Sequence, residues 1–462
     1  MRARIRSELP VIALFAAALA AIGGPAASAG ATARPAGSAH ATAASPSPSR
    51  PVLGPVPGLR LGGLARPELP GARRVPKPGA FSLLNGVYCV TAADCWAVGQ
   101  YGTSHQGSRN EVLHWNGKTW RTVAVPNPGG HAVSSASELF SVRCAGAKDC
   151  WAVGDYTAHG ANLNEALYWN GTRWSKVTTP TPAGNMPGSL NELFDVTCLT
   201  SSRCWAVGEY GTENTTGVVR NEVLRWNGRT WSQVRAPEPA GTTSSHVNSL
   251  NAIRCMSATR CLAVGLDGVL TGPPTLANEA LLWNGKKWSA LATPQPGGTT
   301  TTGDLNVLAG LTCASPTSCW AAGTYGTEAT PTVLLNEVLH WNGATWSQFE
   351  VPNPDGTGTG SDNNLSGAFC SNSRSCWAVG QYSFGHGVVR PLLTQALRWN
   401  GIKWSRVKTP NPAGTADQDS NDLFAVRCSR PDNCWAVGQA AGKSGNTSNL
   451  LLHWNGKAWS VR

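Results

Sequence analysis

Short runs of alternating apolar and polar residues recur along the chain from Ser82 to its last residue, and turn-forming residues separate them. The run from Leu193 to Cys198 is one example, and Cys95–Gly99, with the sequence Cys-Trp-Ala-Val-Gly, opens another. Alternation over so few residues between clusters of Gly, Pro, Asn and Ser is typical of β-strands. The pattern therefore predicts an all-β protein.

The same pattern occurs seven times, with a period of 54 to 58 residues. Each copy has one cysteine and a second one six positions later; these are Cys89 and Cys95, Cys144 and Cys150, Cys198 and Cys204, Cys255 and Cys261, Cys313 and Cys319, Cys370 and Cys376, and Cys428 and Cys434. An Asn-Glu pair follows in most copies, and then Trp-Asn-Gly-x-x-Trp and Pro-x-Pro, as in Asn110–Trp120 and Pro126–Pro128. All 14 Cys and all 20 Trp belong to this repeat.

Each copy reads as four strands, and four-stranded repeats of this length are typical of propeller blades. We therefore expect a seven-bladed β-propeller over residues 81–462, with blades starting near 82, 137, 191, 248, 306, 363 and 421. The first strand has small residues at one register, as a strand crowded near an axis needs; these are Gly86, Ser141, Asp195, Ala252, Gly310, Gly367 and Ala425.

The Asn-Gly dipeptide predicts a two-residue type I′ turn with positive φ at both positions. With Asn116-Gly117 as that turn, Trp115 faces Lys118 and Leu113 faces Trp120. The two tryptophans then share one face of the sheet and pack against the next blade.

The two ends of the chain suggest how the seventh blade is completed. Copy seven lacks a Pro-x-Pro segment, whereas Val75–Gly79, with the sequence Val-Pro-Lys-Pro-Gly, stands before copy one. We hypothesise that this N-terminal piece completes blade seven.

The cysteines predict one Cys-x5-Cys disulfide in each blade. A metal site is the alternative, but one pair of Cys per blade lacks the four ligands of a structural zinc site. Paired cysteines also agree with an oxidising compartment.

The N-terminus predicts secretion. Three Arg, an apolar run over residues 11–22 and the small residues Ala27–Ala29 form a signal-peptide pattern over residues 1–29. Residues 30–80, rich in Ala, Pro, Gly, Ser and Arg, predict a disordered linker. We expect a secreted or cell-wall-associated monomer without integral membrane association.

The net charge does not predict nucleic-acid binding. Residues 1–80 hold ten basic and two acidic side chains, so only +3 of the total +11 remains for residues 81–462. A domain so near neutrality has no electrostatic footprint for nucleic acid.

Residues found in all blades serve folding, so function should lie where the copies differ. The loops between the second and third strands vary most, and we expect binding there; examples are Gly211 to Arg220, Leu266 to Leu276, Tyr325 to Leu335 and Tyr382 to Leu393. Asp155, Asp195 and Glu209 are carboxylates that break the symmetry in blades two and three. They are candidates for acid/base chemistry or cation binding, and solvated surface acids are the alternative. No metal or cofactor motif occurs in the sequence.

The order of apolar strand, Ala-Val-Gly-x-Tyr, Asn-x-x-Leu, aromatic turn, Trp and Pro-x-Pro resembles kelch-type repeats, including the propeller domain of galactose-oxidase-like proteins. The sequence departs from that family at Gly99-Gln100, where kelch repeats usually have two glycines. The paired cysteines resemble a variant from secreted bacterial, actinobacterial-looking proteins. The family's copper site implies a Cys crosslinked to Tyr, but every Cys here is predicted to be paired, so we transfer no catalytic residue.

Our leading interpretation is a non-enzymatic extracellular module that binds a glycan or a protein. The alternative is a polysaccharide-active hydrolase or lyase with carboxylates at the mouth of the channel, and a third interpretation is a structural wall or spore-coat component.

Overall fold

The computed structural model describes residues 80–462 except 104–105, 131, 133, 213–216, 271–273, 328–332, 384–389 and 443–444. The predicted signal peptide, the linker and the segment Val75–Gly79 lie outside the described residues. The described part contains 28 β-strands and no α-helix, as the sequence predicts. None of these described residues belongs to a helix that could cross a membrane.

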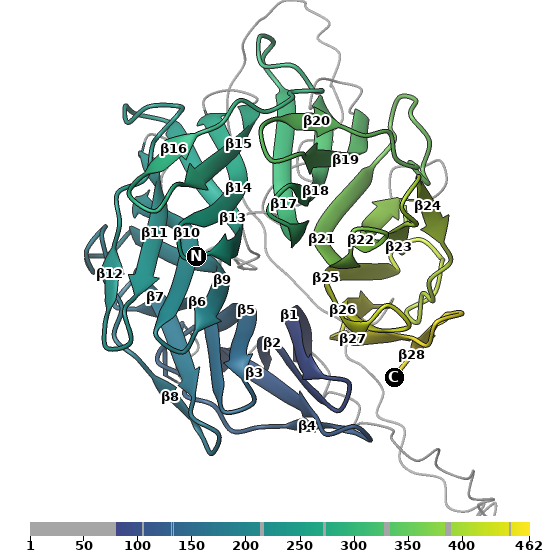
Figure 1. Cartoon of the computed structure of the whole chain (residues 1–462). Coiled ribbons are helices and arrows are strands. Elements are labelled where there is room, and N and C mark those ends of the chain that lie inside the picture. The colour runs from purple at the N-terminus through teal and green to yellow at the C-terminus, as the bar shows by residue number, and fades with distance from the viewer. Residues whose placement is uncertain are drawn as a thin grey trace, which may run out of the picture. The chain divides into compact units, whose positions relative to one another are not determined.

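Each run of four consecutive strands forms one antiparallel blade in chain order, and there are seven such blades (Figure 1). Blades six and seven are joined into one eight-stranded sheet by a single parallel pair, Leu392 with Ser420. The inner strands are β1 (Ala80–Thr91), β5 (Ser137–Gly146), β9 (Ser189–Thr200), β13 (His246–Ser257), β17 (Asp304–Ser315), β21 (Asn363–Asn372) and β25 (Ser420–Arg430). The second strands are β2 (Asp94–Thr103), β6 (Asp149–Ala158), β10 (Arg203–Thr212), β14 (Arg260–Val269), β18 (Ser318–Thr327), β22 (Ser375–Ser383) and β26 (Asn433–Ala441).

The remaining strands form the outer half of each blade. The third strands are β3 (Gln106–Trp115), β7 (Ala161–Trp169), β11 (Val219–Trp226), β15 (Thr275–Trp283), β19 (Val333–Trp341), β23 (Leu392–Trp399) and β27 (Thr447–Trp454). The outermost strands are β4 (Trp120–Thr122), β8 (Trp174–Lys176), β12 (Trp231–Gln233), β16 (Trp288–Ala290), β20 (Trp346–Gln348), β24 (Trp404–Val407) and β28 (Trp459–Val461).

The inner strands surround a common centre (Figure 1). Each one contacts the inner strands of both neighbouring blades, and β25 of blade seven contacts β1 of blade one in the same way. The predicted seven-bladed β-propeller is therefore confirmed. We call the end of the blades with the Cys hairpins the Cys end, and the end with the loops between second and third strands the loop end.

The small residues of the inner strands are explained by close backbone approach. Each inner strand carries a β-bulge directly before this register, as between Leu84 and Gly86. A Cβ atom on Gly86 would lie only 2.7 Å from the carbonyl oxygen of Phe140 in the next blade. Neighbouring inner strands therefore leave little room for a side chain at this position, as the sequence predicts.

Tryptophans join one blade to the next. Trp96 on the second strand of blade one packs against Trp169 and Trp174 of blade two, with ring centroids 4.9 and 5.4 Å apart. Six of the seven interfaces contain such a triad, and in blade four Leu262 takes the place of the second-strand Trp. The two hairpin tryptophans thus share a face as predicted, but they pack against the preceding blade, so the predicted direction was wrong.

The hairpin turn also differs from the prediction. Trp115 pairs with Trp120 instead of facing Lys118, so the loop has four residues, and Leu113 pairs with Thr122. Only Gly117 has a positive φ, of 89°. The turn is not type I′ because the Asn116 side chain stabilises another conformation, in which its Oδ1 accepts hydrogen bonds from the backbone N–H groups of Lys118 and Thr119, both at 3.0 Å.

All seven predicted disulfides are present, and no cysteine is free. The two half-cystines of each bridge are direct partners across the inner and second strands, as for Cys89 and Cys95. Each bridge thus fixes the register of one hairpin at the Cys end.

The repeated Asn-Glu pair forms a chain of buried hydrogen bonds between blades. The Asn side chain of one blade donates to the Glu carboxyl of the next; the pairs are Asn110 with Glu165, Asn164 with Glu222, Asn221 with Glu279, Asn278 with Glu337, and Asn449 with Glu111. In blade six Gln395 replaces Glu and accepts from Asn336 at 2.9 Å. The chain is interrupted only between blades six and seven, where Thr394 and Leu450 replace the donor and the acceptor together.

Burial disfavours the charged form of three carboxyl groups of this chain. Burial raises the pKa of Glu165, Glu222 and Glu337 well above the usual value, and their Asn donors offset only part of this shift. Their second oxygen, Oε2, has no hydrogen-bond partner among the described residues. In Gln395, Nε2 donates to the carbonyl oxygens of Asn364 and Gln381 at 2.8 and 2.7 Å. A protonated Glu supplies an equivalent donor.

We therefore expect Glu222→Gln to raise the free energy of unfolding at about pH 8 and to leave it nearly unchanged at about pH 4. The folded-state pKa of Glu222 is raised, so stability is lost as the pH rises above the unfolded value of 4.5, because the unfolded chain ionises while the folded chain must keep the proton. Urea unfolding at both pH values measures the effect. The exposed Glu350→Gln is the matched control. The reciprocal change, Gln395→Glu, should make the free energy of unfolding fall more steeply as the pH rises. Equal pH slopes for wild type and Glu222→Gln would contradict the neutral-acid assignment.

Removing one disulfide by Cys313→Ser with Cys319→Ser should lower the free energy of unfolding by about 2 kcal/mol, because the bridge restricts a short loop of the unfolded chain. Urea unfolding of the double variant measures this loss. Thiol titration of the denatured wild-type protein without reductant should detect no free thiol, and a substantial thiol signal would contradict the pairing.

Candidate functional site

The three predicted carboxylates lie at two levels of blades two and three. Asp155 and Glu209 follow the Ala-Val-Gly motif on β6 and β10, toward the loop end. Asp195 lies on β9 at the crowded register, nearer to the Cys end. The structure therefore does not bring the three into one group.

Asp195 connects three blades. Its Oδ1 accepts hydrogen bonds from the Ser141 hydroxyl of blade two at 2.7 Å and from the backbone N–H of Val196 at 2.9 Å. Its Oδ2 accepts from the backbone N–H of Ile253 at 2.9 Å and from Arg254 of blade four at 2.6 Å. Both oxygens are thus engaged, and these contacts give the carboxylate a structural role.

Asp155 and Glu209 each face a second carboxylate that the sequence analysis missed. Glu138 is the direct cross-strand partner of Asp155, and Glu192 is that of Glu209. Direct partners on antiparallel strands have Cβ atoms about 5 Å apart. The missed signal was the position six residues before the first Cys of each copy, which holds Leu83, Glu138, Glu192, Ser249, Val307, Asn364 and Asp422.

Amide side chains from the preceding blade position the two newly found carboxylates. Asn85 of blade one donates to Glu138 at 2.7 Å, and Asn162 of blade two donates to Glu192 at 3.0 Å. The result is a row of acids and amides across blades one to three, toward the loop end.

Glu209 is the acid of this row with the most unusual environment. Its side chain is 3% exposed, and Oε2 has no hydrogen-bond partner among the described residues. Burial raises the pKa of Glu209 to about 7, and the hydroxyl of Ser249 offsets part of the shift. Glu192 opposite is only partly buried. The buried Glu209 carboxyl, with its raised pKa, is therefore paired with the Glu192 carboxyl, which solvent can reach.

A second acidic group lies between blades three and four. Burial raises the pKa of Glu238 to about 7 and that of Asp267 to about 6. Both carboxylates act electrostatically on the buried Glu279 and raise its pKa further. Asp267 stands where five other copies carry Tyr. Glu238 accepts a hydrogen bond from the backbone N–H of Asn221, so it also satisfies a backbone donor within β11.

Within the described residues, no group of three or more His, Cys, Asp or Glu side chains could hold a metal ion. The Tyr–Cys copper chemistry of galactose-oxidase-like proteins does not fit the chain, because all 14 cysteines form disulfides.

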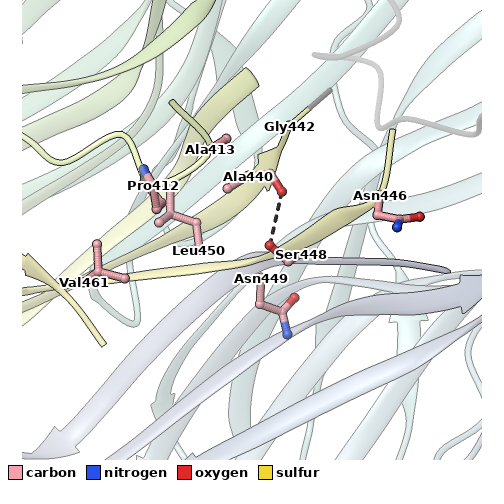
Figure 2. Close-up of a pocket in the computed structure, with 9 residues that line it drawn as sticks. All are labelled: Pro412, Ala413, Ala440, Gly442, Asn446, Ser448, Asn449, Leu450 and Val461. Atoms are coloured by element: carbon pink, nitrogen blue, oxygen red, sulfur yellow. Dashed lines mark hydrogen bonds between the residues drawn. The ribbon is translucent and has the colours of Figure 1, made fainter. Parts of the chain in front are cut away.

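A pocket of about 250 Å³ lies on blade seven (Figure 2). It opens beside Ala440, which stands where five copies carry the larger Tyr. Its polar wall consists of hydroxyl and amide groups, including Ser448, which donates to the carbonyl oxygen of Ala440 at 3.2 Å. The described residues that line this pocket include no titratable side chain.

The variable loops at the loop end are described only in part, since residues 213–216, 271–273, 328–332 and 384–389 fall within them. Ligand binding by these loops remains a prediction.

No protein-family model matches the chain, and no curated protein matches it in sequence. Solved structures do match it in fold. One is the GH74 xyloglucanase from Xanthomonas campestris, with 13% identity, 84% of this chain and 55% of that chain covered, and a TM-score of 0.46. Another is a PL25 ulvan lyase bound to a GlcA–Rha3S saccharide, with 11% identity, 84% and 98% coverage, and a TM-score of 0.48. A third is the lectin BP39L from Burkholderia pseudomallei, with 13% identity, 82% and 98% coverage, and a TM-score of 0.42.

The chain thus spans about half the length of the xyloglucanase, and at these identities each likeness concerns the fold alone. The resemblance to kelch-type repeats remains a prediction, because the matches support a propeller and no particular family. The preference for a protein without catalytic activity was wrong, because the similar structures include a xyloglucanase and a polysaccharide lyase.

The contacts of Asp195 predict a loss of stability in Asp195→Asn, by about 2 to 3 kcal/mol, because the change leaves Arg254 without its counter-charge. Urea unfolding at neutral pH measures the difference. Asp432→Asn is the matched control, since the Asp432–Arg430 pair is exposed and should contribute less than about 1 kcal/mol. An Asp195→Asn protein as stable as wild type would contradict the structural role.

Proposed function

We propose that the chain is a secreted enzyme that cleaves an extracellular polysaccharide, as a hydrolase or a lyase, with Glu192 and Glu209 as its acid/base pair. The observation that carries the proposal is the cross-strand pairing of a partly exposed carboxylate with a buried one whose pKa is raised to about 7. A group that titrates near neutral pH can both donate and accept a proton under working conditions.

Either reaction needs an acid and a base. Two carboxyl groups supply both when one is protonated and the other is ionised, or when one proton moves between them. In hydrolysis, a protonated carboxyl donates its proton to the leaving glycosidic oxygen, and a carboxylate activates water or attacks the sugar. In elimination, a base removes a proton beside a uronic-acid carboxyl group, and an acid protonates the leaving oxygen. In both schemes Glu192 contacts the substrate. In hydrolysis it donates a proton to the leaving oxygen and then takes one from the incoming water; in elimination it takes the proton beside the uronic-acid carboxyl group and returns it to the leaving oxygen. Glu209 exchanges a proton with Glu192 and so restores the starting state of the pair.

The location of the pair supports this assignment. Glu192 and Glu209 lie toward the loop end, where the copies differ most in length and where a specific ligand is best recognised. The seven disulfides fit an oxidising environment outside the cell, in which polysaccharides are the abundant polymer substrates. We propose that the protein acts there as a monomer.

The test is a screen of the purified protein on neutral and uronic-acid polysaccharides. New reducing ends report hydrolysis, and ultraviolet absorbance of an unsaturated sugar reports elimination. On the polysaccharide that is cleaved, Glu192→Gln should lower kcat by about 100-fold or more, the usual size of an acid/base contribution. The wild-type rate should fall as the pH rises through about 7, because Glu209 then loses its proton.

Glu350→Gln, at an exposed position on the outside of blade five, is the control and should keep full activity. Circular dichroism of Glu192→Gln should match that of wild type, so that lost activity is not lost folding. Saturable glycan binding without cleavage of any polysaccharide, or full activity in Glu192→Gln, would overturn the proposal.

A further inference from the structure

One residue from each inner strand stands directly before the first Cys of its blade, and together these residues surround the centre of the propeller at the Cys end. We call them the axial ring; its members are Tyr88, Arg143, Thr197, Arg254, Thr312, Phe369 and Arg427. The neighbouring positions are nearly uniform, with Leu five residues before the Cys in all seven copies. The fold therefore does not require arginine in the axial ring, and the three arginines there need another explanation.

Among the described residues, only one of the three arginines forms an ion pair with a carboxylate, although Asp195 also acts electrostatically on Arg143. Arg254 pairs with Asp195 at 2.6 Å. Arg143 is 8% exposed, and within the described residues it forms no hydrogen bond or ion pair. Its guanidinium stacks over the ring of Tyr88, with Cζ 5.1 Å from the ring centroid.

Arg427 also stacks on Tyr88, and a hydrogen bond with that side chain offsets part of the effect of burial on the pKa of Arg427. Its Cζ lies 4.2 Å from the centroid of Tyr88 and 4.3 Å from that of Phe369. Its Nε is buried without a hydrogen-bond partner among the described residues. The two guanidinium groups thus converge on one aromatic ring and share no carboxylate.

The electrostatics of the ring favour an added anion. Loss of hydration and repulsion by Arg254 and Arg427 lower the pKa of Arg143 to about 9, and loss of hydration lowers that of Arg427 to about 10. Both groups remain charged at neutral pH. Buried charges without a partner are costly, and stacking on Tyr and Phe offsets only part of that cost. An oxyanion between the guanidinium groups would satisfy their donors in the bidentate geometry that arginine prefers.

We infer that the axial ring binds a small oxyanion, held by Arg143 and Arg427 beside Tyr88 at the Cys end of the propeller. The ligand carries a carboxylate, sulfate or phosphate group, either as a free ion or as the acid group of a saccharide. The site is separate from Glu192 and Glu209, because five residues of extended strand place Thr197 about 16 Å from Glu192. The inference does not rest on the proposed function.

Isothermal titration of the full secreted chain tests the site with four probes: inorganic sulfate, inorganic phosphate, glucuronate and glucose. We expect saturable binding of at least one of the three anions and none of glucose. Binding of sulfate or phosphate identifies a site for the free ion, whereas binding of glucuronate alone identifies an acidic saccharide. Arg143→Met and Arg427→Met should each weaken the binding about tenfold or more, since each removes charge-assisted hydrogen bonds.

The matched control is Arg225→Met, which removes an arginine that stacks on Trp205 outside the axial ring; it should bind the anion like wild type. Thermal unfolding in chloride of equal ionic strength separates folding from binding. Without the anion, Arg143→Met should be at least as stable as wild type, because it relieves repulsion between unpaired charges. The absence of saturable binding by all three anions, or equal affinity in wild type, Arg143→Met and Arg427→Met, would overturn the inference.

Discussion

The structure depends on one repeated contact, in which a side chain of the second strand inserts between the two hairpin tryptophans of the following blade. Trp96 with Trp169 and Trp174 is the first example, at centroid distances of 4.9 and 5.4 Å. Aromatic pairs at such distances contribute energy beyond the area that they bury. Because the same contact joins Trp435 of blade seven to Trp115 and Trp120 of blade one, every blade is held on both faces.

The buried Asn-Glu chain shows how strictly polar groups must be matched inside such a packed structure. Between blades six and seven the acceptor is replaced by Leu450 and the donor by Thr394. The hydroxyl of Thr394 instead bonds within its own blade, to Thr409 at 2.8 Å. An Asn at position 394 would face an apolar Leu450 and lose its acceptor, at a cost of about 1 to 3 kcal/mol. The two replacements are therefore physically coupled, although 56 residues separate them in the sequence.

The sequence allowed the fold and all seven disulfides to be predicted, because each rests on residues repeated in every copy. The hairpin turn was predicted wrongly because the Asn116 side chain, rather than the dipeptide preference, determines its geometry. Glu138 and Glu192 were missed because they lie on another strand than Asp155 and Glu209, and only the register brings them together. Asp195 differs visibly from the small residues at the same register of the other copies. Its contacts with three blades, however, depend on backbone positions that cannot be predicted from the spacing of residues in the sequence.

The departures from symmetry place opposite charges at the two ends of the propeller. Carboxylates gather toward the loop end of blades two and three, and arginines gather at the Cys end. An acidic saccharide approaching the loop end would be repelled if both Glu192 and Glu209 were ionised. Burial of Glu209 keeps its proton up to about pH 7 and so halves the negative charge of that pair. In the proposed reaction, the same desolvation that lets Glu209 supply a proton therefore also reduces repulsion between the pair and an anionic saccharide.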